Sequence, residues 1–146
     1  ATTDDDGASI QGNEIFAVAT DKDIWFETKI TPTDAEGDNM DICIGLTVNF
    51  ATNPEAMLTA ADRIVFQVDD GDSNIDCVTE KNGTATTTDS GVDIASGTAV
   101  TLGFHVKSTG SVEFFVNRNK VATHTANIPD DENLALGAMQ LSGSAT

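Results

Sequence analysis

The chain has 146 residues, a length that suits one domain with its own hydrophobic core. Asp and Glu contribute 24 residues against 7 Lys and Arg, so the formal net charge is −17. Such a surface repels nucleic acid and anionic membranes, and no apolar run reaches the roughly 20 residues that span a bilayer. We therefore expect neither nucleic acid nor a membrane as a partner.

The N-terminal segment 1–9, ATTDDDGAS, is acidic and has little apolar surface. Ordering a backbone costs about 1–2 kcal/mol per residue, which this segment cannot offset by itself. We expect an acidic N-terminal arm over 1–9 that is ordered by contact with another chain, followed by a single domain over 10–146. The candidate partner-binding residues of the arm are Asp4, Asp5 and Asp6.

Apolar residues alternate with polar ones along most of the chain, which predicts short strands separated by turns. In the stretch VTLGFHVKSTGSVEFFV this alternation predicts two strands of a β-meander with one buried face. The segment 90–97 is expected to be a loop. The predicted strands are 10–19, 24–30, 40–50, 62–68, 74–80, 85–89, 100–107, 112–116, 121–126 and 134–141.

One segment, 51–61, differs from the rest because its residues favour helix. Asn53 suits the N-cap and Pro54 the first helical position, so we expect a short helix or helical loop that crosses a sheet edge. About ten strands and so little helix predict an all-β sandwich of jelly-roll type. An immunoglobulin-like sandwich is the alternative. The predicted core comprises Phe26, Ile64, Phe66, Leu102, Phe104, Val112 and Phe114.

The two cysteines, Cys43 and Cys77, both lie in strand-like apolar segments. They either pair across neighbouring strands or are small buried hydrophobic residues, and the second reading is favoured. No Cys/His cluster is present, so we expect no zinc and no cofactor. The acidic segment 70–76 lacks the glycine and the glutamate of an EF-hand loop, which favours a turn over a cation site.

Candidate catalytic residues are few. A retaining glycosidase needs two carboxyl groups about 5 Å apart, whereas Glu27 and Glu113 each stand alone on a predicted strand. His105 and His124 lack a recognisable nucleophile beside them, so we expect exposed or half-buried strand residues. The sequence therefore predicts no catalytic residue and no metal ligand.

Sugar-binding sites usually present aromatic platforms, and this chain has one Trp and no Tyr. Trp25 is either such a platform or a packing residue beside Phe26, and packing is favoured. Phe115 interrupts the polar face of its strand, next to Phe114, so it either lies under a loop or contacts another protein. Trp25 and Phe115 complete the set of candidate partner-binding residues.

In the order of several segments, the sequence resembles a group of marine tailed-phage proteins. The resemblance spans about residues 24–141 and rests on the order of WFETKI, CIGL, the long stretch from NPEAM to GFHV, and VEFFVNRNKVATHTANIPDDENL. Those proteins have concanavalin-A-like (lectin/glucanase superfamily) jelly-roll folds and are thought to decorate capsids. The family's usual closing strand after Leu141 is missing here: it lies beyond this sequence, comes from a neighbouring chain or is absent. A sheet without it has an open edge, which we expect to contact a second copy or the capsid protein.

The resemblance implies a non-enzymatic virion structural protein on the outer capsid surface, where it binds the major capsid protein. Contacts with neighbouring copies, or a homo-oligomer, would suit that role. The alternative is a lectin-like, carbohydrate-binding module for host surface glycans. Glucanases of this superfamily carry an E-x-D-x-x-E strand, which is missing from this sequence. A degenerate glycosidase is therefore the third and least favoured reading.

Overall fold

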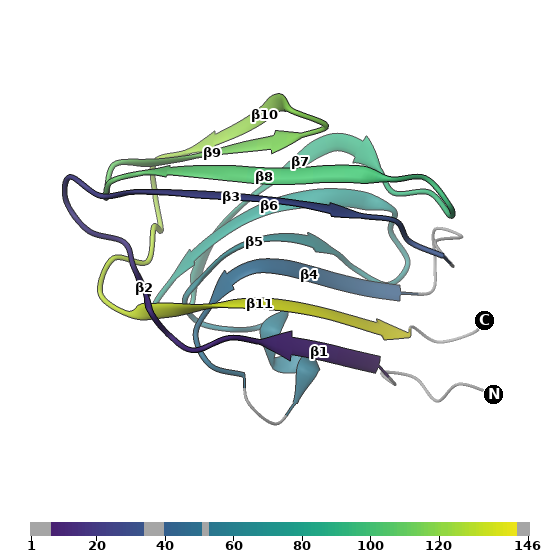
Figure 1. Ribbon diagram of the computed structural model, residues 1–146, viewed down its shortest axis with the longest axis horizontal. Coiled ribbons are helices and arrows are strands. Elements are labelled where there is room, and N and C mark those ends of the chain that lie inside the picture. Colours follow the sequence, from purple (N-terminus) through teal and green to yellow (C-terminus); the bar gives the residue numbers. More distant parts are fainter. Residues whose placement is uncertain (1–6, 34–39, 51–52, 143–146) are drawn as a thin grey trace.

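The computed structural model describes residues 7–33, 40–50 and 53–142, which form eleven strands and one short helix (Figure 1). The expected all-β sandwich is confirmed. The elements are β1 (Gly7–Gln11), β2 (Phe16–Ala17), β3 (Asp23–Ile30), β4 (Met40–Thr47), η1 (Pro54–Met57), β5 (Arg63–Val68), β6 (Asn74–Lys81), β7 (Thr84–Asp93), β8 (Val100–Lys107), β9 (Ser111–Val116), β10 (Asn119–His124) and β11 (Asn133–Ser142).

Two antiparallel sheets form the layers of the sandwich. The large sheet has the order β1-β11-β4-β5-β6-β7, and the short strand β2 also pairs with β11. The small sheet has the order β10-β9-β8-β3 and contains the predicted meander. The large sheet is curved. Strands β11 and β1 extend it beyond β4, on the side away from the small sheet (Figure 1).

The main core lies between the two sheets and contains the predicted residues. Phe66 of the large sheet packs edge-on against Phe114 of the small sheet, with ring centroids 5.3 Å apart. Phe104 lies beside both rings and is 1% exposed. Phe26 packs against this core but is only partly buried, because β3 is the edge strand of the small sheet.

A second apolar cluster covers the outer face of the large sheet, where Phe50 and Met57 pack against β4, β5, β6 and β11. Asn53 caps η1 as predicted, by accepting a hydrogen bond from the Glu55 N–H at 3.2 Å. The expected short helix is confirmed, but it is four residues long and packs on the face of the large sheet rather than crossing its edge. The Met57 carbonyl accepts from the Arg63 guanidinium at 3.0 Å, which occupies the oxygen that a further helical turn would use.

The two cysteines are both free and buried, and they belong to different clusters. Cys43 lies on the outer face of the large sheet, under η1, whereas Cys77 lies on the inner face in the main core. Side chains on opposite faces of one sheet cannot reach each other, so of the two alternatives the structure selects two buried thiols.

The N-terminal boundary differs from the expectation. Gly7 pairs with Leu141 and Gln11 with Gly137, so residues 7–9 of the expected arm belong to strand β1. Asp4, Asp5 and Asp6 lie outside the described residues. The expected open edge beside Leu141 is wrong, because β1 pairs along β11 and itself forms the edge.

Two further expectations are corrected at the level of single elements. The segment 10–19 is not one strand, because the pairing with β11 is interrupted between β1 and β2. Strand β7 continues to Asp93 instead of ending at 89. Gly91 has a φ of 71°, which glycine tolerates well, and the Asp89 carboxylate accepts a hydrogen bond from its N–H at 2.7 Å. This turn lets the strand bend and resume its pairing at Asn74.

Candidate functional site

The outer face of the small sheet carries Trp25, which is 71% exposed. Its strand alternates, so Phe26 points into the core and Trp25 points outward. The antiparallel pairing of β3 with β8 places Trp25 opposite His105, and the two rings stack with centroids 3.6 Å apart and planes 11° apart. The favoured expectation of a packing residue beside Phe26 is therefore wrong, because the two side chains lie on opposite faces of β3.

His105 supports the indole from beneath and is only 7% exposed. Its Nε2 lies 2.8 Å from Asp23 Oδ2, and its Nδ1 lies 3.9 Å from Glu113 Oε2. Asp23 also accepts from the Ser108 N–H at 3.2 Å. The expectation of an exposed or half-buried histidine is wrong here, because the Trp25 ring covers the imidazole.

Glu113 of β9 lies next to His105, on the same face of the small sheet. Its carboxylate contacts Lys107 Nζ at 2.8 Å and Lys120 Nζ at 3.2 Å. The hydrogen bond from Lys107 contributes most to lowering the pKa of Glu113, and Lys120 adds to the effect. Glu113 therefore stays ionised at neutral pH and orients its neighbours rather than donating a proton.

A depression of about 410 Å³ lies beside Trp25. Its floor is Gly103, which pairs with Glu27 on one side and with Phe115 on the other. Because Gly103 has no side chain, the outer face is hollow at this point between Trp25 and the half-buried Phe115. A Cβ at Gly103 would lie 2.9 Å from the Phe26 carbonyl oxygen, so the close approach of β3 also requires glycine.

The polar rim of this depression comes from Glu27, Thr101 and Arg118. Arg118 Nη2 lies 3.4 Å from Glu27 Oε1, and both side chains are mostly exposed. Arg118 follows Asn117 in a two-residue hairpin turn, and both have positive φ, 65° and 51°. Such a turn matches the twist of the strands that it joins. It places the guanidinium at the rim of the depression, beside Glu27 of β3.

The structure thus brings together Trp25 and Phe115, two of the five candidate residues. Sequence reasoning missed Gly103, Arg118 and the supporting role of His105. The alternation of β8 was a usable signal, since it places Gly103 and His105 on the face opposite the core. The contact of that face with Trp25 depends on strand pairing, which the alternation does not specify.

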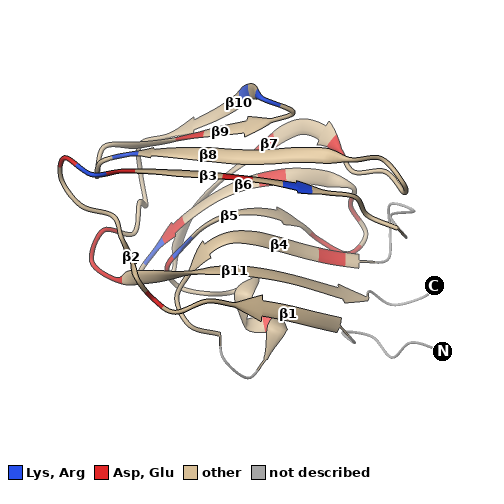
Figure 2. Cartoon of the chain, viewed as in Figure 1, with Lys and Arg blue, Asp and Glu red and all other residues tan. Residues whose placement is uncertain are grey.

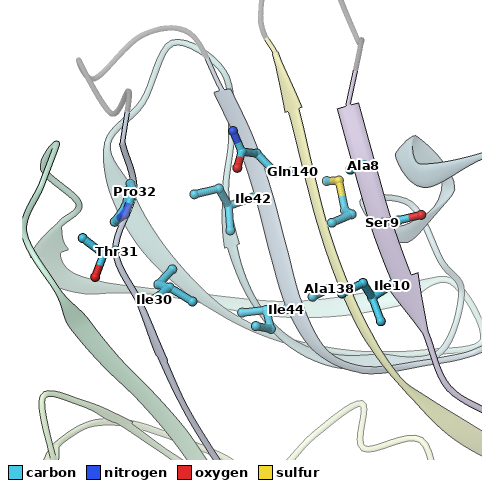
Figure 3. A pocket seen from close by; sticks show the side chains of 11 residues that line it. Ala8, Ser9, Ile10, Ile30, Thr31, Pro32, Ile42, Ile44, Ala138 and Gln140 are labelled. Atoms are coloured by element: carbon cyan, nitrogen blue, oxygen red, sulfur yellow. The ribbon is translucent and has the colours of Figure 1, made fainter.

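A second hollow, of about 250 Å³, lies between β3 and the inner face of β4, β11 and β1 (Figure 3). We call it the β3 groove. Hydroxyl and amide groups at its margin come from Thr31 and Gln140. Its apolar lining comprises Ile10, Ile30, Pro32, Ile42, Ile44 and Ala138.

Basic residues are few and unevenly placed (Figure 2). The small sheet and its turns hold five of the seven, and the large sheet holds Arg63 and Lys81. Members of the first group are Lys22, Lys29, Lys107, Arg118 and Lys120. The outer face of the small sheet is therefore less acidic than the average surface of this chain, whose net charge is −17.

Metal-ligating residues do not gather in the described part of the chain, where no group of three or more His, Cys, Asp or Glu is placed to hold an ion. In the acidic turn, the Asp72 carboxylate accepts a hydrogen bond from the Asn74 N–H at 2.9 Å. Over the described ranges, no helix has the length and apolar character required to cross a bilayer.

The fold is shared with several solved carbohydrate-binding proteins. The carbohydrate binding module CBM66 from Bacillus subtilis has a TM-score of 0.57 and 13% identity, covering 97% of this chain and 81% of that one. Sheep galectin-11, in complex with glycerol, has a TM-score of 0.54 and 12% identity over 99% and 97% of the two chains. The potassium-bound carbohydrate recognition domain of Emp46p reaches a TM-score of 0.68 at 7% identity, over 97% and 73%.

At these identities the likeness concerns the fold, and it confirms the expected concanavalin-A-like jelly roll. No curated protein matches the sequence. A family model described as "SO2946-like, C-terminal domain" matches residues 1–146. The chain therefore belongs to the SO2946-like C-terminal domain family.

Proposed function

We propose that this domain is a carbohydrate-binding module that holds a glycan on the outer face of the small sheet. The observation that carries the proposal is the Trp25 ring, which lies flat on His105 with its other face open to solvent. The apolar C–H face of a sugar ring packs well on such an indole, and the ordering cost is small because His105 already holds the ring in place.

The depression beside the indole supplies the polar part of a glycan site. Glu27 accepts hydrogen bonds, Arg118 donates them, and Thr101 does both, which suits sugar hydroxyl groups. Gly103 leaves room for a ring to approach the sheet, and Phe115 provides a second apolar wall. The names of the similar solved structures, a carbohydrate binding module, a galectin and a carbohydrate recognition domain, support the proposal.

We further propose that binding occurs without hydrolysis. Glycoside cleavage needs a carboxylic acid with a raised pKa beside a second carboxylate. The three carboxylates of this face are paired with basic residues instead, Asp23 with His105, Glu27 with Arg118, and Glu113 with Lys107 and Lys120. The lowered pKa of Glu113 is the opposite of what a general acid requires.

A glycan array probed with the wild type and with Trp25→Ala tests the proposal, followed by calorimetry on the best ligand. We expect the substitution to weaken binding at least about tenfold, because the loss of stacking, about 0.5–1.5 kcal/mol, adds to the loss of the apolar area that the indole buries. Leu136→Ala is the matched control, since Leu136 is an exposed apolar residue on the other sheet. Equal binding by the wild type and Trp25→Ala, or no bound glycan at all, would contradict the proposal.

A second candidate function is decoration of a tailed-phage capsid through the major capsid protein, with the domain on the outer surface of the virion. It is supported by the sequence resemblance and by the exposed apolar residues Ile10, Ile15 and Leu136, which lie on or near the edge of the large sheet. The two functions are compatible, because the Trp25 face belongs to the other sheet. Co-purification with intact particles in a fixed ratio to the capsid protein is expected, and free protein alone would exclude it.

A further inference from the structure

The two sheets differ in width, and this difference creates the β3 groove. Phe66 on β5 packs against Phe104 on β8 and Phe114 on β9, and β7 lies against β10. If the strands of each sheet are followed in order from these contacts, the next strand of the large sheet, β4, lies opposite the last strand of the small sheet, β3. Beyond β4 the large sheet continues with β11 and β1, and no described strand of the small sheet faces them.

Strand β3 is one of the two edge strands of the small sheet, and β10 is the other. It pairs with β8 along its eight residues, and no described strand pairs with its other side. Alternate residues of an edge strand direct their N–H and C=O groups away from the sheet, which is a template for another strand. The inward side chains Ile24, Phe26 and Ile30 are only half-buried, as expected where one more strand would cover them.

The groove next to this edge is apolar (Figure 3). Pairing places Ile10, Ala138 and Ile44 in one row across β1, β11 and β4, and Ile42 lies in the next row. Ile10 is 78% exposed. A strand beside β3 would set alternate side chains against these rows and its other side chains toward solvent.

We propose that the β3 groove binds an extended segment of a partner protein, which joins the small sheet as a fifth strand beside β3. Backbone hydrogen bonds to β3 hold the segment, and alternate apolar side chains fill the groove. Its solvent-facing side chains are basic, because the exposed face of β3 beside them carries Asp23 and Glu27 against Lys29, within a domain of net charge −17. This docking site is separate from the proposed glycan site on the outer face.

A second copy of the domain does not fit this edge. Antiparallel pairing of β3 with the β3 of a second copy keeps both large sheets on the same side of the joined small sheets. Each large sheet extends two strands past β3, so the two extensions would occupy the same space. An acyl chain fits the apolar lining but would leave the edge N–H and C=O groups of β3 buried without partners.

Titration of the full chain with a fluorescein-labelled peptide of alternating Val and Lys, eight residues long like β3, tests the proposal. We expect saturable binding. The decisive comparison is the same peptide with N-methyl groups on alternate backbone amides, made in both registers, because methylation removes the donors that a β-ladder uses. We expect at least one register to bind about tenfold more weakly, since the affinity of strand addition comes mainly from main-chain hydrogen bonds.

Two substitutions on one face of β11 locate the site. Ala138→Lys places a long side chain in the groove and should abolish binding, whereas Leu136→Lys adds the same charge outside the groove lining and should not. Absence of peptide binding to the wild type would overturn the proposal. Binding that is unaffected by N-methylation in both registers would also overturn it, because the groove would then accept apolar side chains without strand pairing.

Discussion

Trp25 and His105 stack face to face across two paired strands, with ring centroids 3.6 Å apart. Asp23 and Glu113 flank the imidazole at 2.8 and 3.9 Å, so the ring that supports the indole is itself held in place. The chain contains a single Trp, and the fluorescence of the protein therefore reports on this contact alone.

We expect His105→Gln to increase the mobility of the Trp25 indole, because the flat imidazole on which the ring stacks is lost. Fluorescence anisotropy of the single Trp measures this mobility. His124→Gln is the control, since His124 lies on the inner face of its sheet. An anisotropy that His105→Gln leaves unchanged would show that the imidazole does not hold the indole in place.

Phe104 should be a principal contributor to stability. It is 1% exposed and contacts three other Phe rings, so Phe104→Ala should lower the free energy of unfolding by about 3–5 kcal/mol. Phe115→Ala is the matched control on the neighbouring strand, and its loss should be smaller because Phe115 is half-buried on the outer face. Urea unfolding of both variants measures the difference, and equal losses would contradict this assignment of faces.

The two Arg–carboxylate pairs should differ strongly in their effect on stability. Arg63 Nε lies 2.8 Å from Glu80 Oε2 with both groups buried, so Glu80→Ala leaves a buried charge and should cost about 3–5 kcal/mol. Arg118→Ala removes an exposed pair and should cost at most about 1 kcal/mol. Denaturant unfolding compares them. A loss for Glu80→Ala as small as that for Arg118→Ala would show that Gln67 and Met57 alone suffice for Arg63.

Acidification should destabilise the fold through His124. The imidazole is buried between two hydroxyl groups, with Nδ1 2.9 Å from Thr79 Oγ1 and Nε2 3.0 Å from Thr88 Oγ1. Burial lowers the pKa of His124 below its ordinary value of 6.5. As pH falls below 6.5 the unfolded chain therefore takes up this proton first, and stability declines until pH reaches the folded-state pKa.

Urea midpoints measured between neutral pH and pH 5 test this expectation. His124→Gln should be less stable at neutral pH, because it loses hydrogen bonds, but its midpoint should depend less on pH over that range. Parallel pH profiles for the variant and the wild type would show that other groups control the decline.

Neither thiol should react in the folded protein. Burial raises the pKa of both Cys43 and Cys77 to about 12, so almost no thiolate is present near neutral pH. We expect no labelling by a thiol reagent under native conditions and complete labelling of both residues in denaturant. Unlabelled cysteines in denaturant without reductant would indicate a disulfide, which their positions on opposite sheet faces exclude.

Period-two alternation was sufficient to predict most strands, the sandwich class and the residues of the main core. Burial of apolar side chains selects the face of each strand, so local pattern and final position agree for residues such as Leu102 and Phe114. The N-cap at Asn53 was also predictable, because capping depends on residues close in sequence.

The candidate sites depend on contacts between residues far apart in the sequence. Trp25 lies on His105, and Gly103 lies between Glu27 and Phe115, because β3 and β9 pair on either side of β8. The β3 groove exists because the N-terminal strand β1 adds to β11 while the small sheet ends at β3. Alternation predicts which face of its strand a side chain occupies. Which side chains become neighbours on that face depends on strand order and register, and the packing of the whole chain determines both.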